Sequence, residues 1–168
     1  MIQQILGYIG AFSPIYMFLL TLFLLRHKRL YFSYYIFGTF ANIILNIFLK
    51  LIIKEARPDK DQTLINIGNA NGKRFGSDIY GMPSGHAQNC AFNFMYITLI
   101  FNSPWISCLY LVIGVITLVQ RYMYNNHTIL QLIIGIIVGL LVGYIVYNYT
   151  NNRIKGQLTQ KKDDNGPL

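Results

Sequence analysis

The chain has 168 residues, which is enough for one domain of ordinary size and too few for two. Hydrophobic residues make up 54% of the sequence and charged residues only 12%, whereas a soluble domain usually carries about 25% charged residues. The formal net charge of +8 comes from 14 Lys and Arg against 6 Asp and Glu, and the bases sit in short clusters between apolar runs. This pattern argues against a nucleic-acid partner and indicates a membrane protein.

Five segments are apolar over most of the length that a membrane-spanning helix needs, about 20 residues. They are Ile5–Leu25, Leu30–Ile53, Ser84–Phe101, Pro104–Val119 and Thr128–Tyr149. Pro14 lies inside the first segment, where we expect it to kink the helix without ending it. The sequence therefore predicts an all-α integral membrane protein, a bundle of about five transmembrane helices.

The remaining segments are polar. Asp59–Met82 is a long, glycine-rich connection that indicates a structured loop between the second and third spans. The tail, residues 151–168, has no apolar periodicity and is predicted to be disordered. We therefore expect one membrane-embedded domain over residues 1–150, followed by a polar cytoplasmic tail.

Five spans place the loops alternately on two faces of the membrane. One face holds the Arg26–Arg29 turn, the Asn102-Ser103 turn and the tail, and short basic loops tend to stay in the cytoplasm. The opposite face holds the N-terminus, the Asp59–Met82 loop and the Arg121–His127 loop. This second face is then expected to look into a lumen or out of the cell.

Most of the unusual polar residues at span ends fall on this second face. They come from three separate stretches of the chain: Lys50 and Arg57; Ser84, Gly85 and His86; Arg121 and His127. Ionisable groups at a membrane boundary are costly unless they are paired, so such a convergence indicates a functional site.

The basic members of this set favour an anionic ligand. Lys50, Arg57 and Arg121 bring three positive charges with no carboxylate on a nearby helix to neutralise them. Arginine can bind phosphate oxygens in a bidentate manner. Ser84 is a good N-cap, and the free N–H groups at a helix start favour phosphate. We therefore expect a phosphate group in the ligand.

The two histidines add chemistry to this site. A neutral imidazole is a nucleophile near pH 7 and a protonated one is an acid, so one of His86 and His127 could attack phosphorus while the other protonates the leaving oxygen. Gln131 lies one helical turn after His127, where its amide oxygen could accept the Nδ1 hydrogen and leave Nε2 free. No spacing typical of a metal site is present, and we expect no metal and no cofactor.

Taken one at a time, these residues have structural explanations. Lys50 at a span end is typical of a snorkelling anchor. Arg57-Pro58 could simply end a helix, and a lone His127 at an interface is usually structural. Only the spacings taken together favour a catalytic site.

Together the residues resemble the three-part signature of the type 2 phosphatidic acid phosphatases (PAP2), a superfamily that also includes bacterial acid phosphatases and vanadium haloperoxidases. The matching segments are Lys50 and Arg57-Pro58 with six residues between them, Pro83-Ser84-Gly85-His86, and Arg121 and His127 with five residues between them. The resemblance implies that His127 is the nucleophile and His86 the general acid. It also implies that the substrate phosphate is held by Lys50, Arg57, Arg121 and the amides of Ser84 and Gly85.

Two positions depart from the family pattern. Gln120 stands before Arg121 where the family usually has Ser, and Gln131 stands where it usually has Asp. A Gln can orient His127 by a hydrogen bond but brings no charge, and losing a carboxylate partner can cost orders of magnitude in rate. A catalytically weak protein that only binds lipid phosphates is therefore an alternative.

The second departure, Gln131, resembles the pattern of one subgroup of the superfamily. Dolichyl diphosphatases carry a His-Thr-x-x-Gln segment like that of residues 127–131, and Gly81-Met82-Pro83 and Ala87-Gln88 are similar to them as well. The subgroup usually has Ser-Ser-His where this chain has Ser84-Gly85-His86. This resemblance implies a lipid phosphatase that hydrolyses a polyprenyl (dolichyl-type) diphosphate to the monophosphate through a phosphohistidine.

The same resemblance implies an enzyme of the endoplasmic reticulum, or another endomembrane, with a luminal site. Three alternatives stay open. The first is a broader lipid phosphate phosphatase that acts on phosphatidic acid or similar lipids, and the second is the lipid-phosphate-binding protein. The third is a small transporter or channel subunit, which is disfavoured because no ionisable residue lies in the middle of any span.

Overall fold

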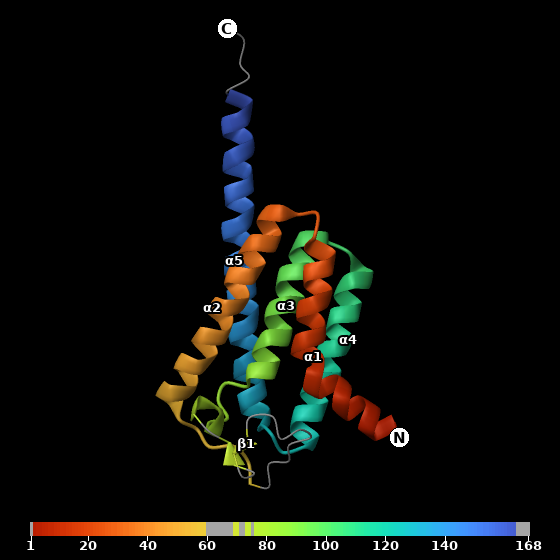
Figure 1. The fold of residues 1–168 in the computed structure, drawn as a ribbon, viewed down its shortest axis with the longest axis vertical. Coiled ribbons are helices and arrows are strands. Elements are labelled where there is room, and N and C mark those ends of the chain that lie inside the picture. The colour runs from red at the N-terminus through yellow and green to blue at the C-terminus, as the bar shows by residue number, and fades with distance from the viewer. Residues whose placement is uncertain (1, 60–68, 71–72, 75, 164–168) are drawn as a thin grey trace.

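The computed structural model describes residues 2–59, 69–70, 73–74 and 76–163. Its helices are α1 (Ile2–Leu25), α2 (Arg29–Ile53), α3 (Gly85–Phe101), α4 (Pro104–Met123) and α5 (Ile129–Asp163) (Figure 1). Between α2 and α3 lie strands β1 (Asn69–Ala70) and β2 (Lys73–Arg74), which pair antiparallel, and the 3-10 helix η1 (Gly76–Ile79). The predicted helical bundle is confirmed, with one small two-stranded ribbon added to its connecting loop.

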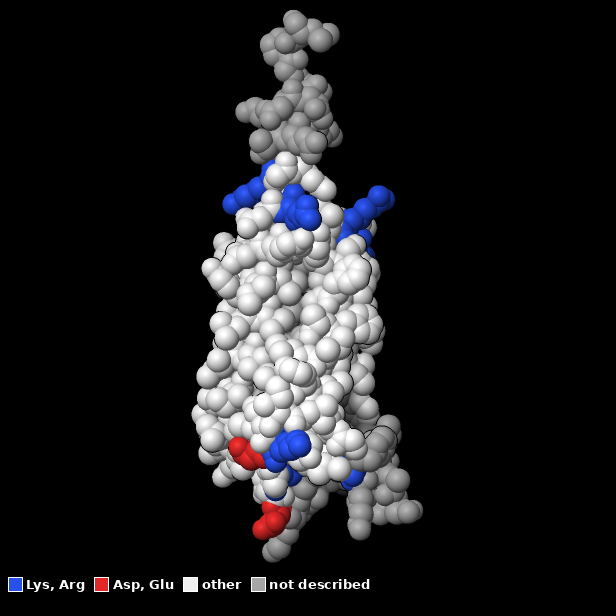
Figure 2. Space-filling view, turned by 90° about the vertical axis from the view of Figure 1, so that its left-hand side faces the viewer, with Lys and Arg blue, Asp and Glu red and all other residues white. Residues whose placement is uncertain are grey.

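Four of these helices are long and apolar enough to cross a membrane: Gly7–Leu25, Arg29–Ile53, Pro104–Met123 and Ile129–Leu158. The fifth, α3, has 17 residues and packs against all four others, most extensively against α5. On the face shown in Figure 2, Lys and Arg lie at both ends of the molecule and Asp and Glu at one end, and a band without charge lies between the two ends. These features identify an integral membrane protein.

The loops alternate between the two ends of the bundle, as the five segments predict. The α1–α2 and α3–α4 turns lie at one end, and the α2–α3 and α4–α5 connections lie at the other (Figure 1). The first turns of α1 point away from the bundle (Figure 1), and Pro14 inside this helix accounts for the bend because it removes a backbone hydrogen bond.

Helix α2 turns its polar face inward. Asn42, Asn46 and Lys50 follow one another at intervals of four residues and are all buried, whereas Phe37 and Phe48 on the other side are exposed. A helix of a soluble protein shows the reverse arrangement. The inverted pattern fits a helix whose surroundings are lipid on one side and polar partners on the other.

Neutral side chains in the middle of the bundle form hydrogen bonds across four helices. Gln88 donates to Asn42 Oδ1 at 2.8 Å, and Asn93 Oδ1 accepts hydrogen bonds from Tyr35 at 2.6 Å and from Thr21 at 3.2 Å. The hydroxyl of Thr21 also lies 2.7 Å from that of a tyrosine on α4. We call these residues the mid-bundle network. A buried polar group has no water to bind in lipid, so its protein partners fix how the helices pack.

Helix α5 approaches α3 closely along a row of three glycines, Gly135, Gly139 and Gly143, which we call the glycine seam. A Cβ atom at Gly135 would stand 2.7 Å from the carbonyl oxygen of Ser84, and one at Gly139 would overlap the carbonyl of Gln88. Glycines spaced four apart let two helix backbones come together in membranes. The seam therefore seats the start of α5 directly against the start of α3.

The end of α5 differs from the prediction made for the tail. The sequence predicts disorder from residue 151 onward, whereas α5 continues to Asp163 and projects beyond the bundle (Figure 1). Extending an existing helix avoids the cost of nucleating a new one, and Arg, Lys, Gln and Leu are good helix formers. A prediction from composition alone treats the tail as a separate segment and does not include the effect of the helix that precedes it. Residues 164–168 lie outside the described part of the chain.

Candidate active site

One end of the bundle collects every residue that the sequence singles out. These residues lie at the end of α2 and just after it (Lys50, Arg57), at the start of α3 (Ser84, Gly85, His86), at the end of α4 (Arg121) and at the start of α5 (His127, Gln131). The same end carries the loop with β1, β2 and η1 (Figure 1).

The chain that leaves α2 runs antiparallel to the chain that enters α3. The N–H of Gly81 donates to the carbonyl of Glu55 at 2.8 Å, and Ala56 forms a β-bridge with Tyr80. This short pairing sets Arg57 opposite η1. Two segments more than 20 residues apart in the sequence thus form one wall of the site.

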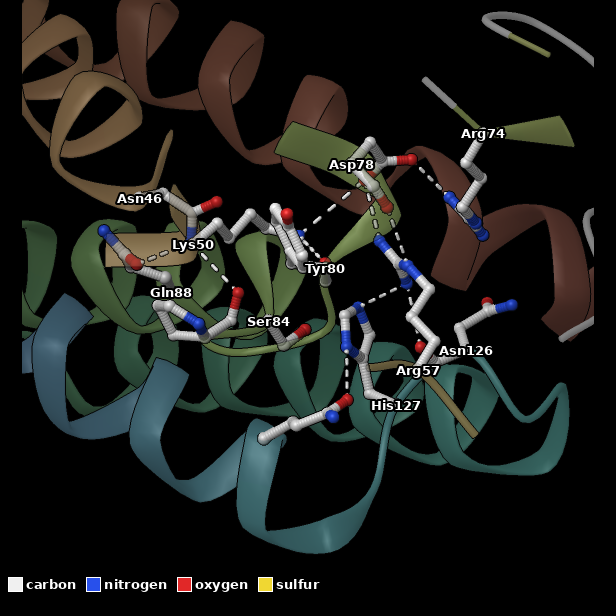
Figure 3. A network of polar contacts seen from close by, with 12 residues as sticks. Asn46, Lys50, Arg57, Arg74, Asp78, Tyr80, Ser84, Gln88, Asn126 and His127 are labelled. Atoms are coloured by element: carbon white, nitrogen blue, oxygen red, sulfur yellow. Dashed lines mark hydrogen bonds and ion pairs between the residues drawn. The ribbon is translucent and has the colours of Figure 1, made fainter. Parts of the chain in front are cut away.

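Three cations surround a single carboxylate in this wall. Arg57 Nη2 lies 2.7 Å from Asp78 Oδ1, Lys50 Nζ lies 3.7 Å from the same oxygen, and Arg74 bonds to the other oxygen (Figure 3). Lys50 Nζ also donates to the carbonyl of Tyr80 at 2.6 Å. The side chains of Lys50 and Arg57 are 4% and 8% exposed, whereas that of Asp78 is 53% exposed. We call Lys50, Arg57 and Arg74 the cationic cluster.

Asp78 changes the charge balance that the sequence indicates. Lys50 and Arg57 have no neutralising carboxylate on a nearby helix, but the loop supplies one from η1. Partial burial raises the pKa of the Asp78 carboxyl, and the neighbouring Arg57, Arg74 and Lys50 together lower that pKa below its ordinary value. Asp78 is therefore ionised at neutral pH and occupies a place that suits an anion.

His127 is held in one tautomer. Its Nδ1 lies 3.2 Å from Gln131 Oε1, and the backbone N–H of Thr128 donates to the same oxygen at 3.2 Å. Because this oxygen only accepts, Nδ1 carries the hydrogen, and Nε2 presents its lone pair to Arg57 Nη1 at 3.2 Å (Figure 3). Burial lowers the pKa of His127, and Arg57 and Lys50 lower it further. The ring is therefore neutral near pH 7, and its Nε2 lone pair accepts a hydrogen bond from Arg57.

Gln131 is itself held from two sides. Its amide nitrogen donates to Glu55 Oε1 and to the carbonyl oxygen of Ala56, each at 2.8 Å. On another side it packs against Gly81, where a Cβ atom would stand 2.6 Å from Gln131 Cδ. Only glycine leaves room for the amide here. The Gln131 amide is thus fixed with its oxygen toward His127.

Ser84 caps α3 as the sequence predicts, since its hydroxyl accepts a hydrogen bond from the N–H of Ala87 at 3.4 Å. Its own N–H, however, donates to the carbonyl oxygen of Gln131 at 3.1 Å. This bond competes with the predicted phosphate contact of the Ser84 amide. At Gly85 a Cβ atom would stand 3.2 Å from Asn46 Oδ1, so this position is closely packed against α2.

His86 faces helix α1. Its Nε2 lies 3.0 Å from the carbonyl oxygen of Ala11. A carbonyl only accepts, so Nε2 of His86 carries a hydrogen. A role as a proton donor to the substrate therefore requires His86 to exchange this partner for the leaving oxygen.

Arg121 is buried at the end of α4, where its Nε donates to Gln120 Oε1 at 2.6 Å. Gln120 is also buried, and Gly10 on α1 leaves space for it, because a Cβ atom at Gly10 would stand 2.5 Å from Gln120 Cβ. Both departures from the family pattern thus hydrogen-bond a site residue, Gln120 to Arg121 and Gln131 to His127.

Sequence reasoning missed Glu55, Arg74 and Asp78. Glu55 lies between Lys50 and Arg57, at a position that the first motif leaves unspecified, and Arg74 and Asp78 lie in the loop between the first and second motifs. Within the described ranges, no three His, Cys, Asp or Glu residues lie close enough together to hold a metal ion.

Comparison with known families agrees with this geometry. The model of the PAP2 superfamily matches residues 31–155, which is most of the chain and includes Lys50, Arg57, His86, Arg121 and His127. Searches of the curated proteins and of the solved structures gave no significant match. From its family match and its membrane-spanning helices, the chain belongs to the PAP2 superfamily of phosphatases, which act on phosphate esters and phosphate-containing lipids.

Proposed function

We propose that the protein is a metal-independent lipid diphosphatase that converts a polyprenyl (dolichyl-type) diphosphate to the monophosphate. The observation that carries this proposal is the state of His127. Its ring is neutral and its Nδ1 hydrogen is bound to Gln131, so the lone pair of Nε2 faces the cationic cluster. A nucleophile aimed at a site for an anion suits attack on phosphorus.

The reaction has two steps. The terminal phosphoryl group enters the cationic cluster and displaces Asp78 from Lys50 and Arg57. His127 Nε2 forms a bond to phosphorus while the bond to the bridging oxygen breaks. His86, which takes up a proton when the negatively charged substrate enters, gives that proton to the bridging oxygen. Water then attacks the phosphohistidine and gives a proton to His86, which releases inorganic phosphate and restores both histidines.

The number of cations supports a diphosphate as the substrate. Lys50 and Arg57 suffice to surround one phosphate, and Arg74 adds a third positive charge on the loop side of Asp78 (Figure 3). A diphosphate has more oxygens and more charge to occupy these groups. The lipid tail would stay in the bilayer, against the apolar outer faces of the helices.

The distribution of charge supports one orientation of the protein in the membrane. The turn at Arg26–Arg29 lies at the end opposite the site, and short basic loops stay in the cytoplasm. The site then faces the lumen of the endoplasmic reticulum or of another endomembrane. An epitope tag placed after residue 168 should be accessible on the cytoplasmic side of sealed vesicles, and protection of that tag would reverse the orientation.

Gln131 favours a second candidate, a protein that binds lipid phosphates with little or no turnover. An Asp at this position would stabilise a positively charged His127 directly, and a neutral amide does so less. A broader phosphatase acting on phosphatidic acid would share the mechanism of the diphosphatase. Substrate preference and turnover separate the three functions.

The test is phosphate release by the detergent-purified protein with a chelator present. Dolichyl diphosphate and phosphatidic acid are compared, with His127→Ala as the blank. We expect release from the diphosphate and none from the variant. Equal release from phosphatidic acid would widen the substrate class, and binding without release would support the second candidate. Activity retained by His127→Ala, or lost with the chelator, would contradict the mechanism.

A further inference from the structure

The contacts of His127 continue beyond Gln131 to a carboxylate. Gln131 accepts the Nδ1 hydrogen at 3.2 Å, and its amide nitrogen donates to Glu55 Oε1 at 2.8 Å. Arg57 donates to the other ring nitrogen at 3.2 Å. One line of hydrogen bonds therefore runs from Arg57 through the imidazole and the amide to Glu55.

Glu55, the last residue in this line, differs from Gln131 because it can carry a negative charge. When Nε2 bonds to phosphorus, the ring keeps its Nδ1 hydrogen and becomes positively charged, and Gln131 has no charge to offset it. Glu55 carries a negative charge that can offset it. Hydrogen bonds in a chain polarise one another, so a carboxylate bonded to the amide nitrogen of Gln131 makes the amide oxygen a better acceptor. Asp78, by contrast, lies among the cations on the other side of the ring.

The orientation of the amide does not depend on Glu55 alone. The N–H of Thr128 donates to the Gln131 oxygen, and the carbonyl of Ala56 accepts from its nitrogen. Both contacts persist if Glu55 becomes neutral. The specific contribution of Glu55 is therefore its negative charge rather than its ability to hold the amide.

We infer that Glu55 is a positioning residue for the reaction, one that stabilises the cationic state of His127 through the side-chain amide of Gln131. This inference rests on the proposed function, because it assigns a role in the same reaction. In the usual family pattern a single Asp at the position of Gln131 would contact the histidine. Here the amide of Gln131 contacts the ring, and the negative charge lies on Glu55 behind it.

The experiment compares four variants of the full chain in detergent. Glu55→Gln removes the charge with little change in shape. Gln131→Glu places two carboxylates face to face, and the double variant Glu55→Gln with Gln131→Glu exchanges the two groups. Asp59→Asn is the matched control, since it removes an exposed carboxylate four residues further along. Phosphate release gives kcat and KM, and thermal unfolding shows that each variant is folded.

We expect Glu55→Gln to lower kcat about tenfold, a typical loss for a group that acts through one intermediate, with KM and the melting temperature little changed. The exchanged pair should recover at least threefold in kcat over Glu55→Gln, because the charge then lies next to the ring. Asp59→Asn should behave like the wild type. Unchanged kcat in Glu55→Gln, or an exchanged pair no better than that single variant, would overturn the inference.

A second measurement does not depend on turnover. The ¹⁵N resonance of His127 Nδ1, identified by its loss in His127→Asn, reports the strength of the hydrogen bond to Gln131. We expect this resonance to shift in Glu55→Gln and to stay in place in Asp59→Asn, and no shift in Glu55→Gln would contradict the coupling. A wild-type protein that releases no phosphate would contradict the proposed function, while the resonance would still decide the coupling.

Discussion

The candidate active site and the mid-bundle network both bury polar groups, but they satisfy them differently. In the network, amides and hydroxyls such as those of Asn93 and Tyr35 find neutral partners on other helices. At the site, Lys50 and Arg57 share the carboxylate of Asp78, which is half exposed. The network is closed to exchange, whereas the site holds its cations with a partner that another anion can replace.

This difference separates stability from function. A closed neutral network fixes helix packing and offers no place for a ligand. A cationic cluster with a replaceable carboxylate can accept an anionic ligand and contributes less to helix packing. Substitutions in the two regions should therefore change different measurements, and the largest expected effect lies at the site.

Arg57→Gln should lower kcat/KM by about 10²–10³, the range for removing one donor that stabilises developing charge. Arg57 contacts both His127 Nε2 and Asp78, so its loss affects the proposed nucleophile and the cationic cluster together. Phosphate release measures the effect. Arg153→Gln, which changes an exposed arginine on α5 more than 20 residues after His127, is the control. Equal losses in both variants would show that Arg57 has no specific role at the site.

Asn93→Ala should lower the free energy of unfolding by about 1–2 kcal/mol, because the buried hydroxyl of Tyr35 loses its acceptor. Thermal or denaturant unfolding in detergent measures this change. Thr98→Val is the control on the same helix, since the buried Thr98 hydroxyl has no hydrogen-bond partner within the described residues. A folded Asn93→Ala protein should keep its kcat, and a selective loss of kcat would contradict the comparison.

The stability of the folded protein should fall on acidification because of His127. Its pKa is lowered in the folded state, so the unfolded chain binds a proton below about pH 6.5 that the folded protein does not. The stabilisation is complete above pH 6.5 and decreases by up to about 1.4 kcal/mol per pH unit below it, until the lowered pKa is reached. Melting temperatures between pH 7 and 5 should fall less steeply in His127→Asn. Parallel curves would argue against a neutral His127.

Asp78→Asn has the smallest expected effect. Removing this half-exposed carboxylate should strengthen competitive inhibition by inorganic phosphate about threefold, the scale of an exposed ion pair. Inhibition constants measure the change. Asp59→Asn again serves as the control, and weaker inhibition in Asp78→Asn would mean that the carboxylate organises the cations more than it competes for them.

The sequence predicts the parts of the fold that depend on local pattern. The apolar segments give the helices, Ser84 gives the start of α3, and the interval of four residues predicts the contact between His127 and Gln131. These features need only helix geometry and the thickness of a bilayer.

The missed features depend on how distant segments meet. Asp78 reaches Arg57 only because the chain after α2 pairs with the chain before α3, and Glu55 reaches Gln131 through the same pairing. No periodicity in the sequence encodes that return path. The helical extension to Asp163 was missed for another reason, since composition describes a segment in isolation and not one attached to a long helix.

The glycine seam has a consequence for the membrane in which the protein works. The start of α5, with His127 and Gln131, and the start of α3, with Ser84, are held together by direct backbone contact along Gly135 and Gly139. The seam is a contact between helix backbones inside the bundle. The distance between these two helix starts should therefore depend little on bilayer thickness.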